Sequence, residues 1–408
     1  MLIDLIVRLD WITYPRTILE AAVGVYSEYL DRNLDFESLC AERKKQLKRI
    51  SGYRNGRDIL VYAADLNKSN AAISISYSDV LPFNDQLSNL KGKKLDLILE
   101  TPGGSGEAAE DMVRVLRDKY EDVAVIVPGW AKSAGTLMTM AADEILMGKA
   151  SALGPIDAQL SWQGKVFSAD ALIEGLDKIK EEVGTGVLNK AYIPILQGIS
   201  PGEIQSARNA LKFAETLVTE WLAKYKFKDW NVHASSGQPV TQEEKTNRAR
   251  EIGVELRDHG KWLTHGRSLK IQDLRGLRLK ITDYTENADL NDAITRYYTL
   301  LQMAFSSNIY KVIETTDSQI YRFLLPQSGQ EISKKAKSEG KAIVEVECLK
   351  CNTLHKLQAN IGKPQPLENG CLAFPADNKL SCTKCGNLLD LVELRRQIEG
   401  QTKGKVAT

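Results

Sequence analysis

The stretch between residues 95 and 160 constrains the fold more than any other part of the chain. It contains two short apolar runs, Leu95–Leu99 and Val123–Val127, each followed by a glycine-containing segment and a helical pattern. This alternation predicts buried parallel strands with helices packed against an α/β sheet. In such sheets the chemistry lies at the carboxyl ends of the strands, where the turns are. We therefore expect the site near Gly103, Gly104 and Ser133.

Two interpretations of Ser133 follow from the local sequence. It stands between the second apolar run and a small-residue helix start, Ala134-Gly135-Thr136. As a nucleophile, it would use backbone N–H groups of Ala134 and of Gly103–Gly104 as an oxyanion hole. As a helix N-cap, it would only accept a hydrogen bond from the first turn. The local sequence favours neither.

Four motifs in order carry a resemblance to a known family: T-P-G-G at 101–104, A-K-S-A-G-T at 131–136, A-A-D-E-I at 141–145 and L-G-P-I-D-A-Q at 153–159. Together they resemble the ClpP/crotonase superfamily, and more closely the serine dehydrogenase proteinase family. The resemblance implies an α/β fold built as a spiral of ββα units. It also implies a serine peptidase that forms an acyl-enzyme on Ser133 and assembles into a homo-oligomer.

The catalytic base does not follow directly from the resemblance. ClpP places its histidine a little over twenty residues after the serine, where this chain has G-P-I-D-A-Q and no histidine. His265, in T-H-G, lies close to where ClpP keeps its third catalytic residue. We therefore predict His265 as base and Asp157 as the acid that orients it, because triads are defined by geometry and not by order along the chain.

Other interpretations of these residues stay open. A lysine could be the base, as in signal peptide peptidase relatives, and the candidates are Lys132, Lys165 and Lys178. Asp157 could instead be structural. The remaining possibility is a catalytically inactive scaffold or an acyl-binding protein that uses the same oxyanion hole. His233 and His259 have polar neighbours in the sequence and are predicted to be surface residues.

The C-terminal part contains two C-x-x-C pairs about thirty residues apart. Each pair can place two thiolates on one turn, and two such turns form a tetrahedral four-cysteine zinc site. The sequence therefore predicts a zinc ribbon that holds one structural zinc per chain through Cys348, Cys351, Cys382 and Cys385. His355 and Cys371 lie between the pairs and are candidate replacement ligands. We expect the ribbon to bind a protein or nucleic-acid partner.

The length of 408 residues allows several domains. We predict an N-terminal helical segment at 1–51, the peptidase domain at 52–310, a linker at 311–341, the zinc ribbon at 342–395 and a tail at 396–408. The formal net charge of +1 gives no general reason to bind nucleic acid or a membrane surface. No apolar run approaches the ~20 residues that span a bilayer, and no secretory signal is evident. The expected location is the cytoplasm, without a membrane partner.

Overall fold

The computed structural model describes residues 24–162, 165–186, 189–324, 340–348, 350–402 and 405–407. The chain divides into two compact units, Met1–Phe323 and Leu324–Thr408. Among the helices of the described residues, none has the length and apolar character needed to cross a membrane. The candidate residues for catalysis lie in the larger unit and the cysteine pairs in the smaller one.

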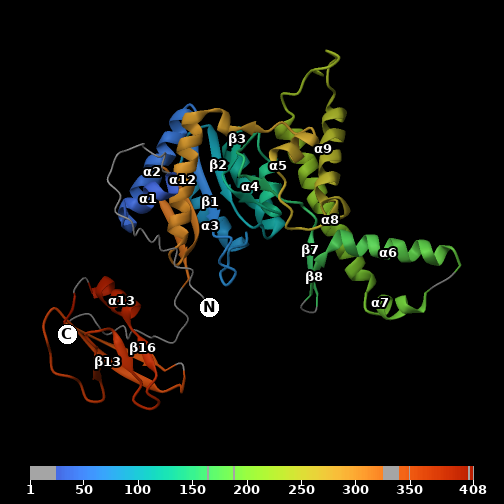
Figure 1. Cartoon of the computed structure of the whole chain (residues 1–408). Coiled ribbons are helices and arrows are strands. Elements are labelled where there is room, and N and C mark those ends of the chain that lie inside the picture. Colours follow the sequence, from blue (N-terminus) through green and yellow to red (C-terminus); the bar gives the residue numbers. More distant parts are fainter. Residues whose placement is uncertain are drawn as a thin grey trace, which may run out of the picture. The chain divides into compact units, whose positions relative to one another are not determined.

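A seven-stranded sheet forms the centre of the larger unit, in the order β11-β10-β1-β2-β3-β5-β9 (Figure 1). The strands from β1 to β9 in this order are parallel, and β10 and β11 are antiparallel to their neighbours. The strands are β1 (Asp58–Ala64), β2 (Lys94–Glu100), β3 (Asp122–Val127), β5 (Glu144–Met147), β9 (Thr282–Asp283), β10 (Ile309–Thr315) and β11 (Gln319–Phe323). This is the α/β class that the two apolar runs predicted.

Helices cover both faces of this sheet, and the side chains of each strand alternate between them. Along β2, Leu95, Leu97 and Leu99 pack into one hydrophobic cluster, whereas Ile98 packs into the other. The helices of the first cluster are α3 (Tyr77–Ser88), α4 (Gly106–Lys119), α5 (Ala134–Met140), α8 (Pro201–Trp221), α9 (Gln242–Arg257), α10 (His259–Trp262) and α11 (Ile271–Gly276). Those of the second are α2 (Phe36–Tyr53) and α12 (Ala288–Phe305).

The segment that follows α12 differs from the sequence prediction. Residues 311–323 were assigned to a linker, but they belong to β10 and β11 of the main sheet. β10 carries two charged residues, Lys311 and Glu314, and both are fully buried. Lys311 pairs with Asp79 at 2.8 Å and Glu314 with Arg43 at 3.1 Å. Burial of charges is tolerated when they are paired in this way.

The N-terminal helices also contribute to the larger unit. α1 (Val25–Asp31) contacts α12, and α2 places Leu47 and Ile50 in the second hydrophobic cluster. The prediction of helix in 1–51 therefore holds for the described part, while residues 1–23 lie outside it. Because α2 is part of the core, it is not a separate helical module.

An arm extends from the larger unit beside α8 (Figure 1). It consists of the hairpin β7 (Gln159–Trp162) and β8 (Lys165–Ser168), followed by α6 (Ala169–Gly184) and α7 (Ile193–Gln197). α6 packs on α8 through a small apolar cluster around Ala169, Ala207 and Leu211. The hairpin begins two residues after Asp157, so the arm starts at the edge of the candidate site.

The smaller unit is a β-rich module with its own hydrophobic core, which includes Cys348 and Cys382. Its elements are β12 (Lys341–Glu347), β13 (Leu354–Ile361), β14 (Leu372–Ala373), β15 (Lys379–Ser381), β16 (Leu388–Asp390), α13 (Val392–Thr402) and β17 (Val406–Ala407). Strand pairing of β12 with β13 and of β15 with β16 sets each cysteine pair beside a hairpin.

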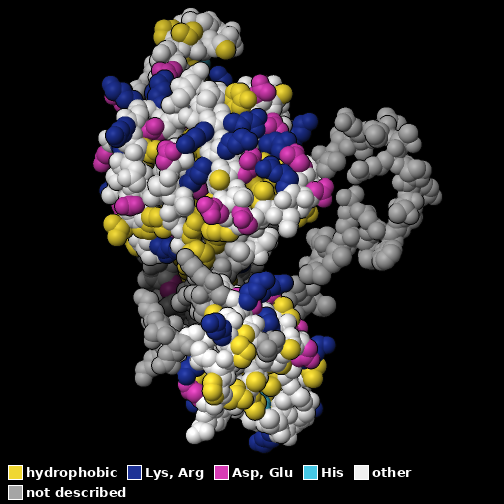
Figure 2. Space-filling view, turned by 90° about the vertical axis from the view of Figure 1, so that its left-hand side faces the viewer, with side chains coloured by type: hydrophobic (Ala, Val, Ile, Leu, Met, Phe, Trp, Pro, Cys, Tyr) yellow, Lys and Arg dark blue, Asp and Glu magenta, His cyan; other side chains and the backbone are white. Residues whose placement is uncertain are grey.

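The face of the molecule seen in the space-filling view has no large region of purely positive or purely negative charge. Lys and Arg side chains are interspersed with Asp and Glu over the larger unit (Figure 2). This distribution agrees with the formal net charge of +1. On this face the structure thus gives no electrostatic reason for extended nucleic-acid binding.

Candidate active site and metal centre

Ser133 lies on a sharp turn between β4 (Trp130–Ala131) and α5. Its backbone angles, φ 49° and ψ −115°, fall where residues other than glycine are rare. Its hydroxyl makes no capping hydrogen bond to α5, so the helix-cap interpretation is not supported. Strained strand-to-helix turns of this kind hold the nucleophilic serine of α/β-hydrolases. The turn thus has the backbone shape that a nucleophile requires.

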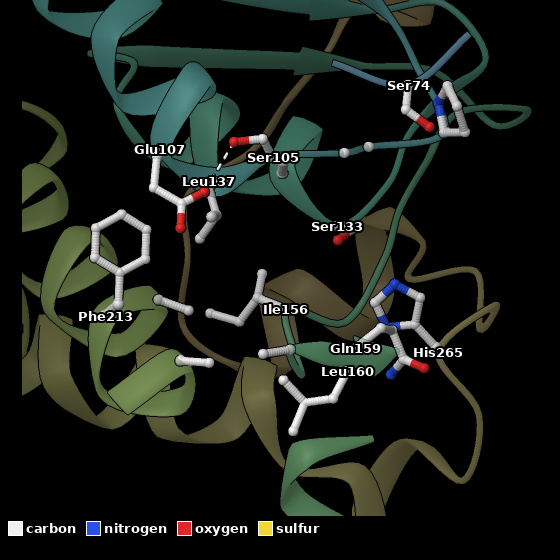
Figure 3. Close-up of a pocket in the computed structure, with 18 of the residues that line it drawn as sticks. Ser74, Ser105, Glu107, Ser133, Leu137, Ile156, Gln159, Leu160, Phe213 and His265 are labelled. Atoms are coloured by element: carbon white, nitrogen blue, oxygen red, sulfur yellow. Dashed lines mark hydrogen bonds between the residues drawn. The ribbon is translucent and has the colours of Figure 1, made fainter. Parts of the chain in front are cut away.

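Ser133 and His265 line one cavity of 690 Å³ at the carboxyl ends of the strands (Figure 3). Figure 3 shows a ring nitrogen of His265 on the side facing the Ser133 hydroxyl. No hydrogen bond joins the two side chains in the part of the chain that the structure describes, as is common before substrate binds. Apolar side chains of Leu137, Ile156 and Phe213 form another wall.

The glycine turn after β2 packs directly against the serine turn. Thr101 makes backbone hydrogen bonds to Trp130 and Lys132, which bring the two turns together. Gly103 has φ +100°, and a Cβ atom there would lie 2.6 Å from Cβ of Ser133 and 2.7 Å from the Lys132 carbonyl oxygen. Only glycine fits this close approach and this backbone angle.

The backbone donors at this junction are not equivalent. The N–H of Gly103 donates to the Thr101 hydroxyl at 3.1 Å, so it is already occupied. Among the described residues, the N–H groups of Gly104 and Ala134 donate no hydrogen bond. Of the three predicted oxyanion-hole residues, Gly104 and Ala134 therefore have backbone N–H donors available. Gly103 instead contributes by having no side chain, which allows the two turns to approach each other.

Thr136 connects the serine turn to the loop that carries Asp157. Its hydroxyl contacts the carbonyl oxygens of Ala131 and Gly154 at 2.9 Å each, and it accepts from the Gly154 N–H at 3.0 Å. These bonds join the A-K-S-A-G-T and L-G-P-I-D motifs physically. Asp157 follows Gly154 by three residues and is fully buried.

Asp157 is bonded to two histidines. Nδ1 of His265 lies 2.7 Å from Oδ1, and Nδ1 of His259 lies 2.9 Å from Oδ2, which also accepts from Gln159 at 3.0 Å. An ionised carboxylate only accepts, so both rings carry hydrogen on Nδ1, which leaves Nε2 of a neutral His265 as an acceptor. Burial raises the pKa of Asp157, but the interactions with His265 and His259 outweigh it, so the pKa lies below its usual value.

The structure brings together the three residues predicted as a triad, and it adds one that sequence reasoning missed. His259 was predicted to be a surface residue, yet it bonds to the buried carboxylate. Its signal in the sequence was only the spacing H-x-x-x-x-x-H with His265. His233 instead lies 3.0 Å from Glu244, away from Asp157.

The lysines considered as alternative bases have other contacts. Nζ of Lys132 donates to the Arg267 carbonyl and the Ser268 hydroxyl, each at 2.9 Å, and to the Leu153 carbonyl at 3.2 Å. Burial, together with the charge of Lys270, lowers the pKa of Lys132 to about 8. Lys178 pairs with Glu174 on the exposed surface of α6, and Lys165 is exposed on β8. None of them lines the cavity at Ser133.

In the smaller unit the four predicted cysteines come together. Their Sγ atoms all lie within 4.8 Å of one another, and the pairs Cys348–Cys385 and Cys351–Cys382 are 3.6 Å apart. Four sulfurs at the ~2.3 Å zinc–sulfur distance of a tetrahedron stand about 3.8 Å apart, so the cluster has the size of a zinc site. These four residues could hold a metal ion.

The neighbouring residues support the cluster without joining it. His355 is buried, and its Nε2 lies 3.3 Å from Sγ of Cys382, where its N–H can donate to a thiolate. The four-cysteine set therefore does not need His355 or Cys371 as a ligand. Backbone N–H groups of Asn352 and Gly386 bond back to the Cys348 and Cys382 carbonyls and close each turn.

Comparison with known families identifies part of the chain. Residues 70–193 match the family described as ClpP-like SDH-type serine proteinase. The match covers less than half of the chain. The match contains Gly103, Ser133 and Asp157, whereas His259 and His265 lie beyond its end. The predicted resemblance and the ClpP-like α/β fold class are thereby confirmed.

Two relatives of the chain are uncharacterized proteins of Methanocaldococcus jannaschii. One, MJ1495, is 28% identical over 243 residues, which are 60% of this chain and 66% of the relative. The other, MJ0137, is 30% identical over 171 residues, which are 41% of this chain and 54% of the relative. The matches thus span less than two thirds of each relative's length.

Two solved structures have a low overall similarity to the chain. A mutant of the membrane-bound stomatin-specific protease 1510-N has a TM-score of 0.30 at 15% identity, covering 53% of this chain and 79% of that one. A mutant of ClpP1 from Listeria monocytogenes has a TM-score of 0.29 at 10% identity, covering 59% and 99%. The resemblance to the family rests on the sequence match and not on these scores.

Proposed function

We propose that the protein is a serine peptidase that hydrolyses peptide bonds through an acyl-enzyme on Ser133. The observation that carries the proposal is the convergence on one cavity of the strained, uncapped Ser133 and of His265, whose Nδ1 bonds to the buried Asp157. A serine needs such a base to become nucleophilic. The family match supports the same chemistry.

The proposed reaction assigns one role to each residue. Nε2 of His265 takes the hydroxyl proton as Oγ of Ser133 attacks the peptide carbonyl carbon, and Asp157 holds the imidazolium. The N–H groups of Gly104 and Ala134 donate to the oxyanion that forms. The tetrahedral intermediate collapses as His265 gives the proton to the leaving amine. Water then attacks the acyl-enzyme by the same path and releases the acid.

The test is covalent labelling combined with peptide hydrolysis. We expect an alkyl fluorophosphonate, which reacts with activated serines, to label the wild-type protein once, at Ser133, and to block hydrolysis of unstructured peptides. Ser133→Ala should remove both labelling and hydrolysis. Ser74→Ala is the matched control, because Ser74 lines the same cavity but its hydroxyl makes no hydrogen bond within the described residues.

The competing possibility is an inactive scaffold or acyl-binding protein. In that case peptides would bind without cleavage, and the fluorophosphonate would leave Ser133 unmodified in the folded wild-type protein. That result would refute the peptidase. Equal hydrolysis by Ser133→Ala and the wild type would refute the role of this serine.

For the smaller unit we propose one structural zinc, bound by the four cysteines, in a ribbon that binds a partner. The support is the sulfur geometry and the closed set of four ligands, which leaves no open position for catalysis. The surface of this unit exposes hydrophobic side chains, among them Leu354, Leu367 and Leu388 at 52%, 51% and 61% (Figure 2). Such residues can supply a contact surface for a protein partner.

Two further features belong to the proposal through the family resemblance. We propose a cytoplasmic homo-oligomer, because ClpP-like proteins usually enclose their sites by assembly, and because the four clustered thiols suit a reducing compartment. Sedimentation of the purified protein at micromolar concentration should give a species larger than 45.4 kDa. A monomer there would contradict the assembly.

A further inference from the structure

A second cavity, of 810 Å³, lies in the larger unit at the opposite edge of the sheet from Ser133. Glu144 and Thr282, which open the strands β5 and β9, line it. Those are the amino ends of parallel strands, whereas the Ser133 cavity lies at carboxyl ends. The two cavities share no lining residue. The peptidase reaction gives this second cavity no role.

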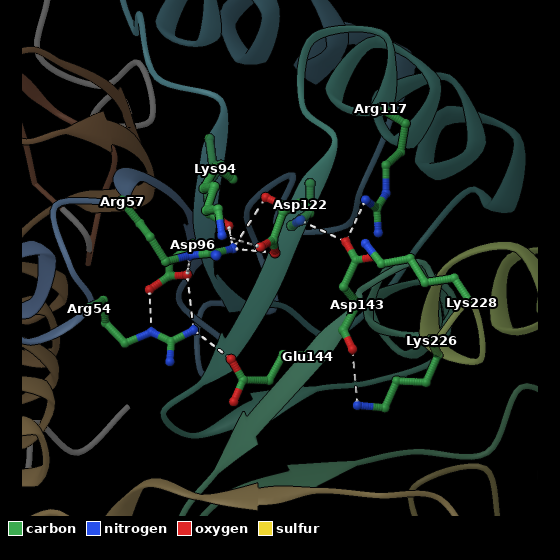
Figure 4. A network of polar contacts seen from close by, with 12 residues as sticks. Arg54, Arg57, Lys94, Asp96, Arg117, Asp122, Asp143, Glu144, Lys226 and Lys228 are labelled. Carbon is green, nitrogen blue, oxygen red and sulfur yellow. Dashed lines mark hydrogen bonds and ion pairs between the residues drawn. The ribbon is translucent and has the colours of Figure 1, made fainter. Parts of the chain in front are cut away.

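Two carboxylates on its wall are already neutralised from outside the cavity (Figure 4). Asp143 pairs with Arg117 at 2.7 Å and also with Lys228. Glu144 pairs with Arg54 at 2.7 Å. None of these three cations lines the cavity. The acidic wall therefore contributes little net negative charge to the interior.

Three cations on the wall lack a comparable counter-charge. The side chains of Arg278 and Lys280 make no hydrogen bond or ion pair within the described residues, and the side chain of Lys226 donates there only to the backbone oxygen of Asp143, at 3.2 Å. Burial and the charge of Lys280, opposed by the charge of Glu144, together lower the pKa of Lys226 to about 8. Asp229 is the remaining acid on the wall, and it forms no ion pair among the residues that the structure describes. The balance inside the cavity is positive.

Two unusual backbone segments bring these cations to the cavity. Lys226 ends a π-helical turn, η2 (Leu222–Lys226), in which the Phe227 N–H bonds to the Leu222 carbonyl. Arg278 has φ +60°, a left-handed conformation that is uncommon outside glycine. π-Turns occur often at functional sites. Two independent departures from regular backbone thus converge on one cavity.

Aromatic rings stand beside the cations. Phe227 and Trp230 pack edge to face with ring centroids 5.7 Å apart, and His233 packs on Trp230 at 5.4 Å. All three line the cavity. A flat apolar group can lie on such rings, while cations bind an attached anion.

We propose that this cavity binds a small phosphate ester that carries a planar ring. The phosphate would lie between Lys226, Arg278 and Lys280 and relieve the repulsion between the two lysines. The ring would contact Phe227 and Trp230. The cavity volume is in the range of sites for small organic ligands, which runs from about 300 to 1,000 Å³.

Phenyl phosphate is the probe, with inorganic phosphate and phenol as its two halves. We expect saturable binding of phenyl phosphate to the full chain by calorimetry, with a Kd near or below about 1 mM. Inorganic phosphate should bind at least about tenfold more weakly, and phenol should not bind measurably. Binding should change the tryptophan fluorescence in the wild type and not in Trp230→Phe.

Lys226→Met and Arg278→Gln should each weaken phenyl phosphate binding by about tenfold or more. Arg278 is exposed, so its variant tests the proposal even if the half-buried Lys226 change impairs folding. Lys224→Met is the matched control, since Lys224 lies on the same π-turn, exposed and outside the cavity. Ser133→Ala should bind as the wild type does.

Three outcomes would overturn the proposal: no binding at about 10 mM, equal loss in the Lys224 control, or full affinity in both cavity variants. Loss of binding in Ser133→Ala would assign the probe to the other cavity and also contradict it. Because the assay needs no hydrolysis, failure of the peptidase proposal leaves this test intact.

Discussion

Replacing Asp157 by asparagine should test the triad most sharply, because it keeps the shape of the side chain and changes one hydrogen-bonding group. The carboxylate accepts from His265 at Oδ1 and from both His259 and Gln159 at Oδ2. An asparagine has one carbonyl oxygen and one NH₂ group, so it cannot accept on both sides. Two donors on the Oδ2 side outnumber the one on the Oδ1 side. We therefore expect the carbonyl oxygen to stay with His259 and Gln159.

The NH₂ group then faces His265 and donates to its Nδ1. This fixes the tautomer with hydrogen on Nε2, which cannot take the proton of Ser133. In serine proteases the corresponding change lowers kcat by about 10⁴-fold, and we expect a loss of roughly 10³–10⁴-fold here. The free energy of unfolding should change by no more than about 1.5 kcal/mol, since a hydrogen bond to each partner remains.

The assay is the initial rate of hydrolysis of a fluorogenic peptide, together with urea unfolding of each variant. Asp170→Asn is the control: Asp170 is a nearby acid that accepts from the His259 backbone N–H at 3.0 Å and pairs with Arg257, but it does not line the cavity. It should retain most activity. An Asp157→Asn protein with more than about a tenth of the wild-type rate would refute the tautomer argument.

Three other predictions follow from the same structure. His265→Gln should lose about as much activity as Ser133→Ala, because members of one catalytic unit are not additive; a largely active variant would point to a lysine base. Gly103→Ala should inactivate the enzyme, because its Cβ meets Ser133 and the Lys132 backbone, whereas Gly56→Ala, at φ +72° with nothing within 4 Å, should cost stability but not activity. Metal analysis of freshly purified protein should give one zinc per chain, retained in Cys371→Ser and lost in Cys382→Ser; a zinc-free wild type would refute the ribbon.

The sequence predicted the sheet and the serine turn because both are local patterns. The strands β2 and β3 are uninterrupted apolar runs, and small residues surround Ser133 wherever another chain segment approaches it. The sequence did not predict β10 as a strand, because Lys311 and Glu314 interrupt its apolar pattern. Their partners Asp79 and Arg43 lie more than two hundred residues away, and no local pattern can show such pairing.

The histidines illustrate the same limit at the site. His265 and Asp157 are 108 residues apart, and the family match ends at residue 193. His265 could be suggested as the base only because its T-H-G motif lies close to the position of the third catalytic residue in ClpP. His259 had no such argument, because its contact with Asp157 depends on the turn after α10 that brings both histidines to one carboxylate. Its polar neighbours in the sequence, Asp258 and Lys261, favoured a surface position.

Lys132 precedes the proposed nucleophile, and it can support the site by hydrogen bonding without accepting the Ser133 hydroxyl proton. Its amine donates to the Arg267 carbonyl and the Ser268 hydroxyl, so the residue before Ser133 holds the segment that follows His265. Leu153 and Leu269 add two backbone hydrogen bonds between the Asp157 loop and the same segment. The proposed nucleophile, acid and base thus lie on three chain segments that are hydrogen-bonded to one another. A lysine at this position resembles a candidate base in sequence, but its hydrogen bonds favour a positioning role, in which it would hold the proposed base His265 near Ser133.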